Sequence, residues 1–118
     1  MITVFVPSGR DERLAQVEHL LLQAAASMTR RLACVPSASK LSEALAKGDL
    51  CAFACTLREQ VAVLLKTHSQ FATDAIWRLI DAVWFWNDVR TLRWKFLTTA
   101  GYDRYLDWAD ENARLSMT

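Results

Sequence analysis

The segment from residue 74 to residue 98, DAIWRLIDAVWFWNDVRTLRWKFLT, constrains the fold of this chain more than any other stretch. It contains four of the five tryptophans of the sequence and has no glycine or proline. Thr73 and Asp74 at its start are side chains of the kind that cap helix N-termini. Gly101 follows it as a candidate C-terminal cap, because glycine readily adopts the left-handed conformation. We therefore predict one long helix that stops near Ala100.

At about 100° per residue, this helix would present two apolar stripes on nearly opposite faces, separated by a narrow polar wedge with Asp81, Asp88 and Lys95. The first stripe comprises Ile76, Leu79, Ile80, Val83, Trp86, Trp94 and Leu97. The second stripe comprises Phe85, Val89, Leu92 and Phe96. A helix that is apolar on nearly all sides must be covered on nearly all sides. Either it lies at the centre of a bundle, or one stripe is reserved for another protein chain.

The composition favours a single all-α domain that spans residues 1 to 118. Of these 118 residues, 53% are hydrophobic and 23% are charged, which is enough apolar material for a core. Three glycines and two prolines are too few for an all-β fold with many turns. We predict a small bundle of about five helices around the long Trp-rich helix, with a short extended N-terminal arm.

The charge balance argues against two classes of partner. A formal net charge of +1 gives no overall attraction to nucleic acid or to an anionic membrane. The longest charge-free runs are shorter than the roughly 18 apolar residues that span a bilayer, and the N-terminus has no cleavable signal pattern. These features predict a cytoplasmic protein that contacts neither a membrane nor nucleic acid directly.

Capping residues and apolar periodicity predict four further helices, at about residues 10–33, from Ser37 or Ser39 to near Lys47, 50–68 and 102–115. Gly48 suits the left-handed position after the second of these, and Asp49 can cap the third. The expected buried stripe of the first helix is Leu14, Val17, Leu21, Ala24, Ala25, Met28 and Leu32. The last helix carries an acidic face that is expected to balance basic residues of the Trp-rich segment: Asp103, Asp107, Asp110 and Glu111 against Arg90, Arg93 and Lys95.

The first residues predict an extended arm. Residues 2–6, ITVFV, are rich in β-branched side chains and are followed by Pro7, Ser8 and Gly9. No later segment offers a convincing second strand. The arm must therefore pair with a symmetry mate, add to the edge of a partner's sheet, or lie over the bundle.

The three cysteines do not suit a disulfide framework. Cys34, Cys51 and Cys55 are odd in number, and the last two share one face of a helix, so we predict reduced thiols in the core. Two helical thiols with His19 and His68 lack the paired spacing of a zinc site, and His19 is expected at the surface. No metal and no cofactor is predicted.

Two other function classes stay open as alternatives. The helices on either side of Gly48 have part of the spacing of a helix-turn-helix, which would make a small DNA-binding regulator. The second helix opens with Leu50, Cys51, Ala52 and Phe53, however, where base readout needs polar side chains. The chain has no Gly-rich loop and no paired catalytic motif, so we predict no catalytic residue. A non-catalytic enzyme subunit is the other alternative.

Tryptophan close to arginine is the most abundant chemical feature of the Trp-rich segment. These side chains dominate the energetics of protein interfaces. We therefore predict a regulatory protein-binding module that also forms a homodimer, because the two stripes exceed what the other helices can cover. The predicted protein-binding residues lie along the second stripe and its rim: Trp84, Phe85, Val89, Leu92, Arg93 and Phe96.

Over its full length the chain resembles the small helical antiactivators that bind LuxR-type quorum-sensing regulators, in particular the LasR-directed kind. The likeness rests on the N-terminal ITVFVPSG arm, on helices joined by tight capped turns, and on the aromatic DAIWRLIDAVWFWNDVR helix. The resemblance implies a dimer that docks on the ligand-binding domain of the regulator and prevents it from dimerising and binding DNA. The protein-binding residues named above come from helix geometry alone.

Overall fold

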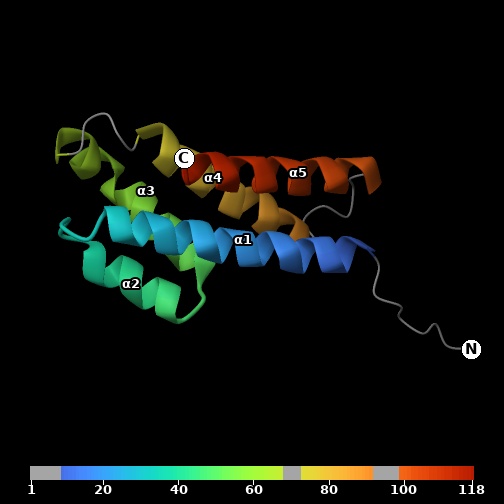
Figure 1. The fold of residues 1–118 in the computed structure, drawn as a ribbon, viewed down its shortest axis with the longest axis horizontal. Coiled ribbons are helices and arrows are strands. Elements are labelled where there is room, and N and C mark those ends of the chain that lie inside the picture. Colours follow the sequence, from blue (N-terminus) through green and yellow to red (C-terminus); the bar gives the residue numbers. More distant parts are fainter. Residues whose placement is uncertain (1–8, 68–72, 92–98) are drawn as a thin grey trace, which may run out of the picture.

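The computed structural model describes residues 9–67, 73–91 and 99–118. Within these ranges the chain forms five helices and no strand, which confirms the predicted all-α bundle (Figure 1). The helices are α1 (Gly9–Arg31), α2 (Ala38–Ala46), α3 (Leu50–Thr67), α4 (Thr73–Arg90) and α5 (Thr99–Ser116). The predicted N-terminal arm at residues 2–6 lies outside the described residues.

Helices α1, α4 and α5 run side by side along the long axis of the molecule, and α2 lies at one end beside α3 (Figure 1). α4 contacts α1, α3 and α5, so three helices cover part of the Trp-rich helix, while its face with Asp74, Trp77 and Asp81 is exposed. α1 contacts all four other helices. Its alanine pair, Ala24 and Ala25, is buried, and small side chains at this position let neighbouring helices approach closely.

The prediction of one continuous helix from residue 74 to residue 100 is wrong. α4 ends at Arg90, and Thr91 forms a turn in which its N–H and its hydroxyl both donate to the carbonyl of Asn87. α5 already begins at Thr99 and packs along α4. Two parts of one straight helix could not pack against each other in this way. The segment reverses because packing α5 against α4 buries apolar side chains of both helices, a gain that local helix propensity does not include. Residues 92–98 lie outside the described residues.

The turn between α2 and α3 has the predicted caps. Gly48 has a φ of 68°. Its N–H donates to the carbonyl of Leu45, and the N–H of Asp49 donates to the carbonyl of Ala44 at 2.9 Å, which together form a Schellman motif. The Asp49 carboxylate then accepts the N–H of Ala52 at 3.0 Å and caps α3. One residue of left-handed backbone therefore separates two capped helices.

The predicted core is largely confirmed. Ile76, Leu79, Ile80, Val83 and Trp86 of the first stripe are buried, and so is the α1 stripe, apart from Leu14, which is half-buried. Trp94 and Leu97 lie outside the described residues. The cysteines were predicted to be in the core, but Cys34 and Cys55 are exposed and Cys51 is half-buried. All three are free thiols. Cys55 lies on the face of α3 opposite Phe53 and Leu57, which take the buried positions.

The acidic face of α5 pairs with a different helix from the one expected. Arg13 of α1 donates to Asp107 and to Asp110, each at 3.0 Å, and Arg114 donates to Asp110 at 2.6 Å. Arg90 instead bonds to Asn87 within α4. Further along α1, the guanidinium of Arg31 donates to the carbonyls of residues 116 and 117, both at 2.9 Å, and so fastens the end of α5 to α1.

Candidate protein-binding surface on α4 and α5

The sequence-predicted protein-binding residues divide into three groups. Trp84 and Phe85 are half-buried on α4. Val89 is only 2% exposed and belongs to the hydrophobic core. Leu92, Arg93 and Phe96 lie outside the described residues. The structure thus leaves Trp84 and Phe85 as members of the predicted set that reach the surface of the described chain.

Phe85 is the centre of an aromatic cluster that joins α4 to α5. Its ring centroid lies 5.5 Å from that of Tyr105 in an edge-on arrangement and 5.4 Å from that of Trp108. The Tyr105 and Trp108 centroids are 5.8 Å apart. Aromatic pairs at such separations stabilise a contact beyond their buried area. Trp108 is nevertheless 40% exposed, so the cluster begins in the helix interface and ends at the surface.

A second pair of tryptophans lies on the other flank of the outer face of α4. Trp77 and Trp84 are seven residues apart, so they project to nearly the same side of the helix. Trp77 is 41% exposed, and Trp84 is half-buried. We call the residues Trp77, Trp84, Phe85, Tyr105 and Trp108 the aromatic surface. An exposed tryptophan leaves a large apolar area in water, and exposed apolar patches mark interaction sites.

Hydrogen bonds at exposed positions join α4 to α5 beside this surface. Arg78 of α4 donates to the side-chain oxygen of Asn112 on α5 at 3.1 Å. The side-chain nitrogen of Asn112 in turn donates to the carbonyl of Trp108 at 2.9 Å. This chain of bonds ties α4 to the turn of α5 that carries Trp108. The aromatic side chains are therefore presented on a frame of two fastened helices, which lowers the entropy lost when a partner binds.

Sequence reasoning missed Trp77, Tyr105 and Trp108 as members of this surface. The spacing held a usable signal, because Trp108 and Leu115 are seven residues apart and both are exposed on one side of α5. What the spacing cannot show is that α5 lies against α4. The aromatic surface exists only because the two helices are adjacent.

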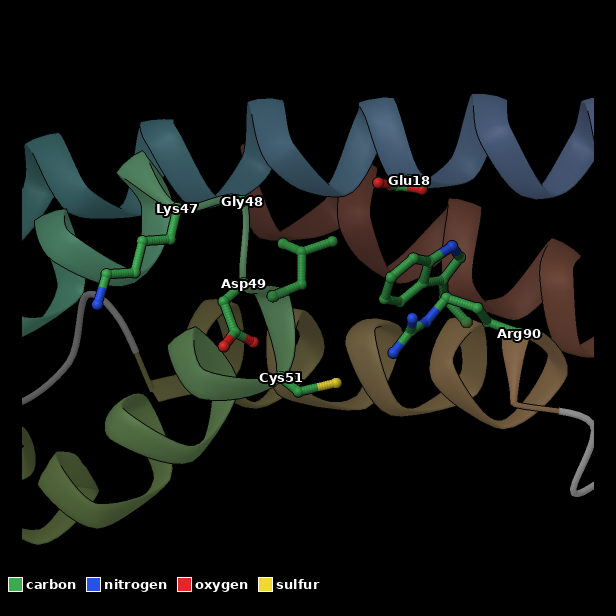
Figure 2. Close-up of a pocket in the computed structure, with 8 residues that line it drawn as sticks. Glu18, Lys47, Gly48, Asp49, Cys51 and Arg90 are labelled. Carbon is green, nitrogen blue, oxygen red and sulfur yellow. The ribbon is translucent and has the colours of Figure 1, made fainter.

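A separate polar cavity of about 350 Å³ lies where α1, the α2–α3 turn and the end of α4 meet. Figure 2 shows Glu18 above the cavity, Lys47 and Asp49 on the turn, and Arg90 across from them. The Arg90 guanidinium lies 4.8 Å from the centroid of the Trp86 ring and donates to Asn87 at 2.8 Å. Arg90 is thus held in place by its own helix, and the cavity wall carries charges of both signs.

Cys51 also lines this cavity, at the start of α3. Burial raises the pKa of the Cys51 thiol, and the neighbouring Arg90 offsets that effect only in part. A raised pKa reduces the fraction of thiolate, which is the reactive form. A smaller fraction of the Cys51 thiol is therefore ionised at neutral pH than in an ordinary cysteine. Among the described residues, no group of three or more His, Cys, Asp and Glu side chains is arranged to hold a metal ion.

Comparison with protein-family models, with curated proteins and with solved structures finds no match for this chain. None of the helices in the described ranges combines the length and the apolar character needed to cross a membrane. Function must therefore be inferred from the side chains that the fold brings to the surface.

Proposed function

We propose that the protein is a regulatory protein-binding module that acts without a cofactor and uses the aromatic surface to dock on its partner. The observation that supports this is the exposure of Trp77 and Trp108, each at about two fifths, on two helices fastened to each other. Tryptophan is the side chain most enriched among interface residues that carry binding energy. Phe85 and Tyr105 extend the same surface inward, as the partly buried base of an interface core would.

The class of partner comes from the sequence resemblance. By that resemblance the partner is a LuxR-type transcriptional activator, and binding inhibits it by blocking its dimerisation and its attachment to DNA. The exposed Trp77 and Trp108 form a docking surface whatever the class of the partner. A partner of another class would leave the role of Trp77 and Trp108 unchanged.

The test compares wild-type protein with a Trp77→Ala, Trp108→Ala double variant in affinity purification from the native cell, followed by mass spectrometry. We expect a partner that the wild type captures and the double variant loses. Val63→Ala is the matched control, because Val63 is as exposed as Trp77 but lies on α3. The proposal fails if the double variant retains every partner of the wild type, or if Val63→Ala loses the same partners.

Two further measurements check that the double variant is folded and how binding affects the partner. Circular dichroism of the double variant should match the wild type, because both tryptophans are partly in water and their removal leaves the buried core intact. If the captured partner is a LuxR-type activator, adding the wild-type protein to the purified activator should convert activator dimers to monomers in analytical ultracentrifugation. A stable activator dimer in the complex would contradict inhibition by blocked dimerisation.

A further inference from the structure

We infer that the partner segment seated on the aromatic surface is a basic amphipathic helix. The inference rests on the proposed function and specifies the chemistry of the segment that the surface receives. It comes from three carboxylates that run along the outer face of α4 between the aromatic side chains.

Asp74, Asp81 and Asp88 follow one another at intervals of seven residues, so they form a single line along α4. At 100° per residue this line runs between Trp77 and Trp84 on one flank and Phe85 and Arg78 on the other, and Arg78 is bonded to Asn112 of α5. Asp74 and Asp81 are exposed and Asp88 is half-exposed. The outer face of α4 is thus an acidic line with aromatic side chains on both sides.

Within residues 9–67, 73–91 and 99–118, these three carboxylates have no partner. Among the described residues, none of them takes part in an ion pair or a hydrogen bond through its side chain. On α5, by contrast, Asp107 and Asp110 are both paired with Arg13 of α1. The acidic line on α4 is therefore free to pair with cations from outside the chain, and the flanking aromatic side chains also attract cations to their faces.

Spacing indicates a helical occupant. α4 has 18 residues and is about 27 Å long, so a facing helix of similar length could run along the whole line. A helix that carries Lys or Arg at seven-residue intervals would place one cation near each carboxylate, and its neighbouring apolar positions would meet the tryptophans. Such a partner matches both the charge and the repeat of the surface.

The carboxylates of the acidic line disfavour a second copy of this chain, nucleic acid and anionic lipid as occupants of the surface. Two copies of α4 paired about a two-fold axis would bring Asp81 against its own counterpart and Asp74 against Asp88 of the partner. Like charges placed opposite each other suppress binding. The phosphates of nucleic acid and of anionic lipid headgroups would meet the same repulsion.

The experiment screens a displayed library of helical peptides of about 18 residues, unbiased in charge, against the full-length protein. We expect enriched sequences with net positive charge and with Lys or Arg at seven-residue intervals. Their affinity, measured by isothermal titration calorimetry, should fall at least tenfold for an Asp74→Asn, Asp81→Asn, Asp88→Asn variant. It should also fall as salt is raised from about 50 mM to about 500 mM, because exposed charge pairs are screened.

Asp103→Asn on α5 is the matched control, since it removes one carboxylate outside the acidic line and should leave affinity within about twofold of wild type. Enriched peptides that are neutral or acidic, or that bind the triple variant as tightly as wild type, would overturn the inference. If such peptides still lose binding with Trp77→Ala and Trp108→Ala, the docking surface stands and only its charge preference fails. A library that yields no binder counts against both proposals.

Discussion

Asp110 of α5 accepts hydrogen bonds from Arg13 of α1 and from Arg114 of its own helix. Burial of its carboxyl would raise its pKa, but the hydrogen bonds from Arg114 and Arg13 outweigh that effect and lower the pKa below its ordinary value. Its side chain is only 17% exposed, so solvent screens these contacts less than it screens ordinary surface pairs. The charged form of Asp110 therefore stabilises the fold.

The sign of the pH dependence follows from the lowered pKa. A carboxyl whose pKa is lower in the folded state contributes stability that is fully present above its unfolded pKa and is lost as pH falls through the folded pKa. We expect the free energy of unfolding to fall in this way below about pH 4. Asp110→Asn should cost about 1 kcal/mol at neutral pH and flatten this dependence, while Asp103→Asn should do neither. Urea denaturation at a series of pH values measures the free energy of unfolding of each variant. If the stability of Asp110→Asn fell below about pH 4 as steeply as that of the wild type, the stabilising role of the Asp110 carboxylate would be contradicted.

Leu79 belongs to the first apolar stripe of α4, which is expected to form the core. It is 0% exposed and lies in the core between α4 and its neighbours. Leu79→Ala should lower the free energy of unfolding by about 2 to 5 kcal/mol, because it leaves a cavity in a packed interior. Leu115→Ala, at a position that is 37% exposed, should cost less than about 1 kcal/mol. Chemical denaturation of the two variants gives the comparison, and equal losses would mean that Leu79 does not lie in the core.

The form of the α2–α3 turn depends on two residues, the left-handed Gly48 and the capping Asp49. A Cβ at Gly48 would meet no atom within 4 Å, so substitution there strains only the left-handed backbone. Gly48→Ala should therefore cost about 1 kcal/mol, and Gly48→Asn less, because asparagine tolerates this conformation. The separate variant Asp49→Ala should also cost about 1 kcal/mol, because it removes the N-terminal cap of α3. Thermal unfolding ranks the three variants, and an Asn variant weaker than the Ala variant would contradict backbone strain as the cause.

The pairing of α4 with α5 changes what a charge at Phe85 is expected to do. Because the sequence places Phe85 among the predicted protein-binding residues, the original expectation is that a charged residue there abolishes binding and leaves stability nearly unchanged. In the structure Phe85 packs against Tyr105 and Trp108, so Phe85→Glu should lower the free energy of unfolding by about 1 to 3 kcal/mol. Trp77→Gln, at a position that is 41% exposed, should cost less, at about 0.5 to 1 kcal/mol. Chemical denaturation separates the two, and a fully stable Phe85→Glu protein would restore the original expectation.

At the scale of the whole molecule, the homodimer stays a prediction, and fewer exposed apolar residues support it than the sequence indicated. Of the described members of the second stripe, Phe85 packs against α5 and Val89 is buried in the core, so they leave less apolar area for a dimer than the sequence indicated. Leu92 and Phe96 lie outside the described residues. Light scattering at micromolar concentration is expected to give a dimer mass, and Trp77→Ala with Trp108→Ala should not change it, because like charges disfavour self-pairing of that face. A monomer mass would contradict the homodimer.

The sequence by itself determined the features that depend on neighbours along the chain. The helix around Leu50 to Leu57, the left-handed Gly48, the cap at Asp49 and the buried stripe of α1 all follow from local backbone preference and from the repeat of apolar side chains. These properties act within a few residues, so periodicity and capping chemistry are enough to predict them.

Only the tertiary structure decided which apolar stripe is covered and by what. The end of α4 at Arg90, the burial of Val89, the exposure of Trp108 and the attachment of Arg13 to Asp110 all depend on α5 lying against α4 and α1. Many helix arrangements satisfy the same apolar periodicity, because hydrophobic burial has no direction. The arrangement is selected by the summed packing of residues far apart in the chain, and this sum cannot be read from spacing along one helix.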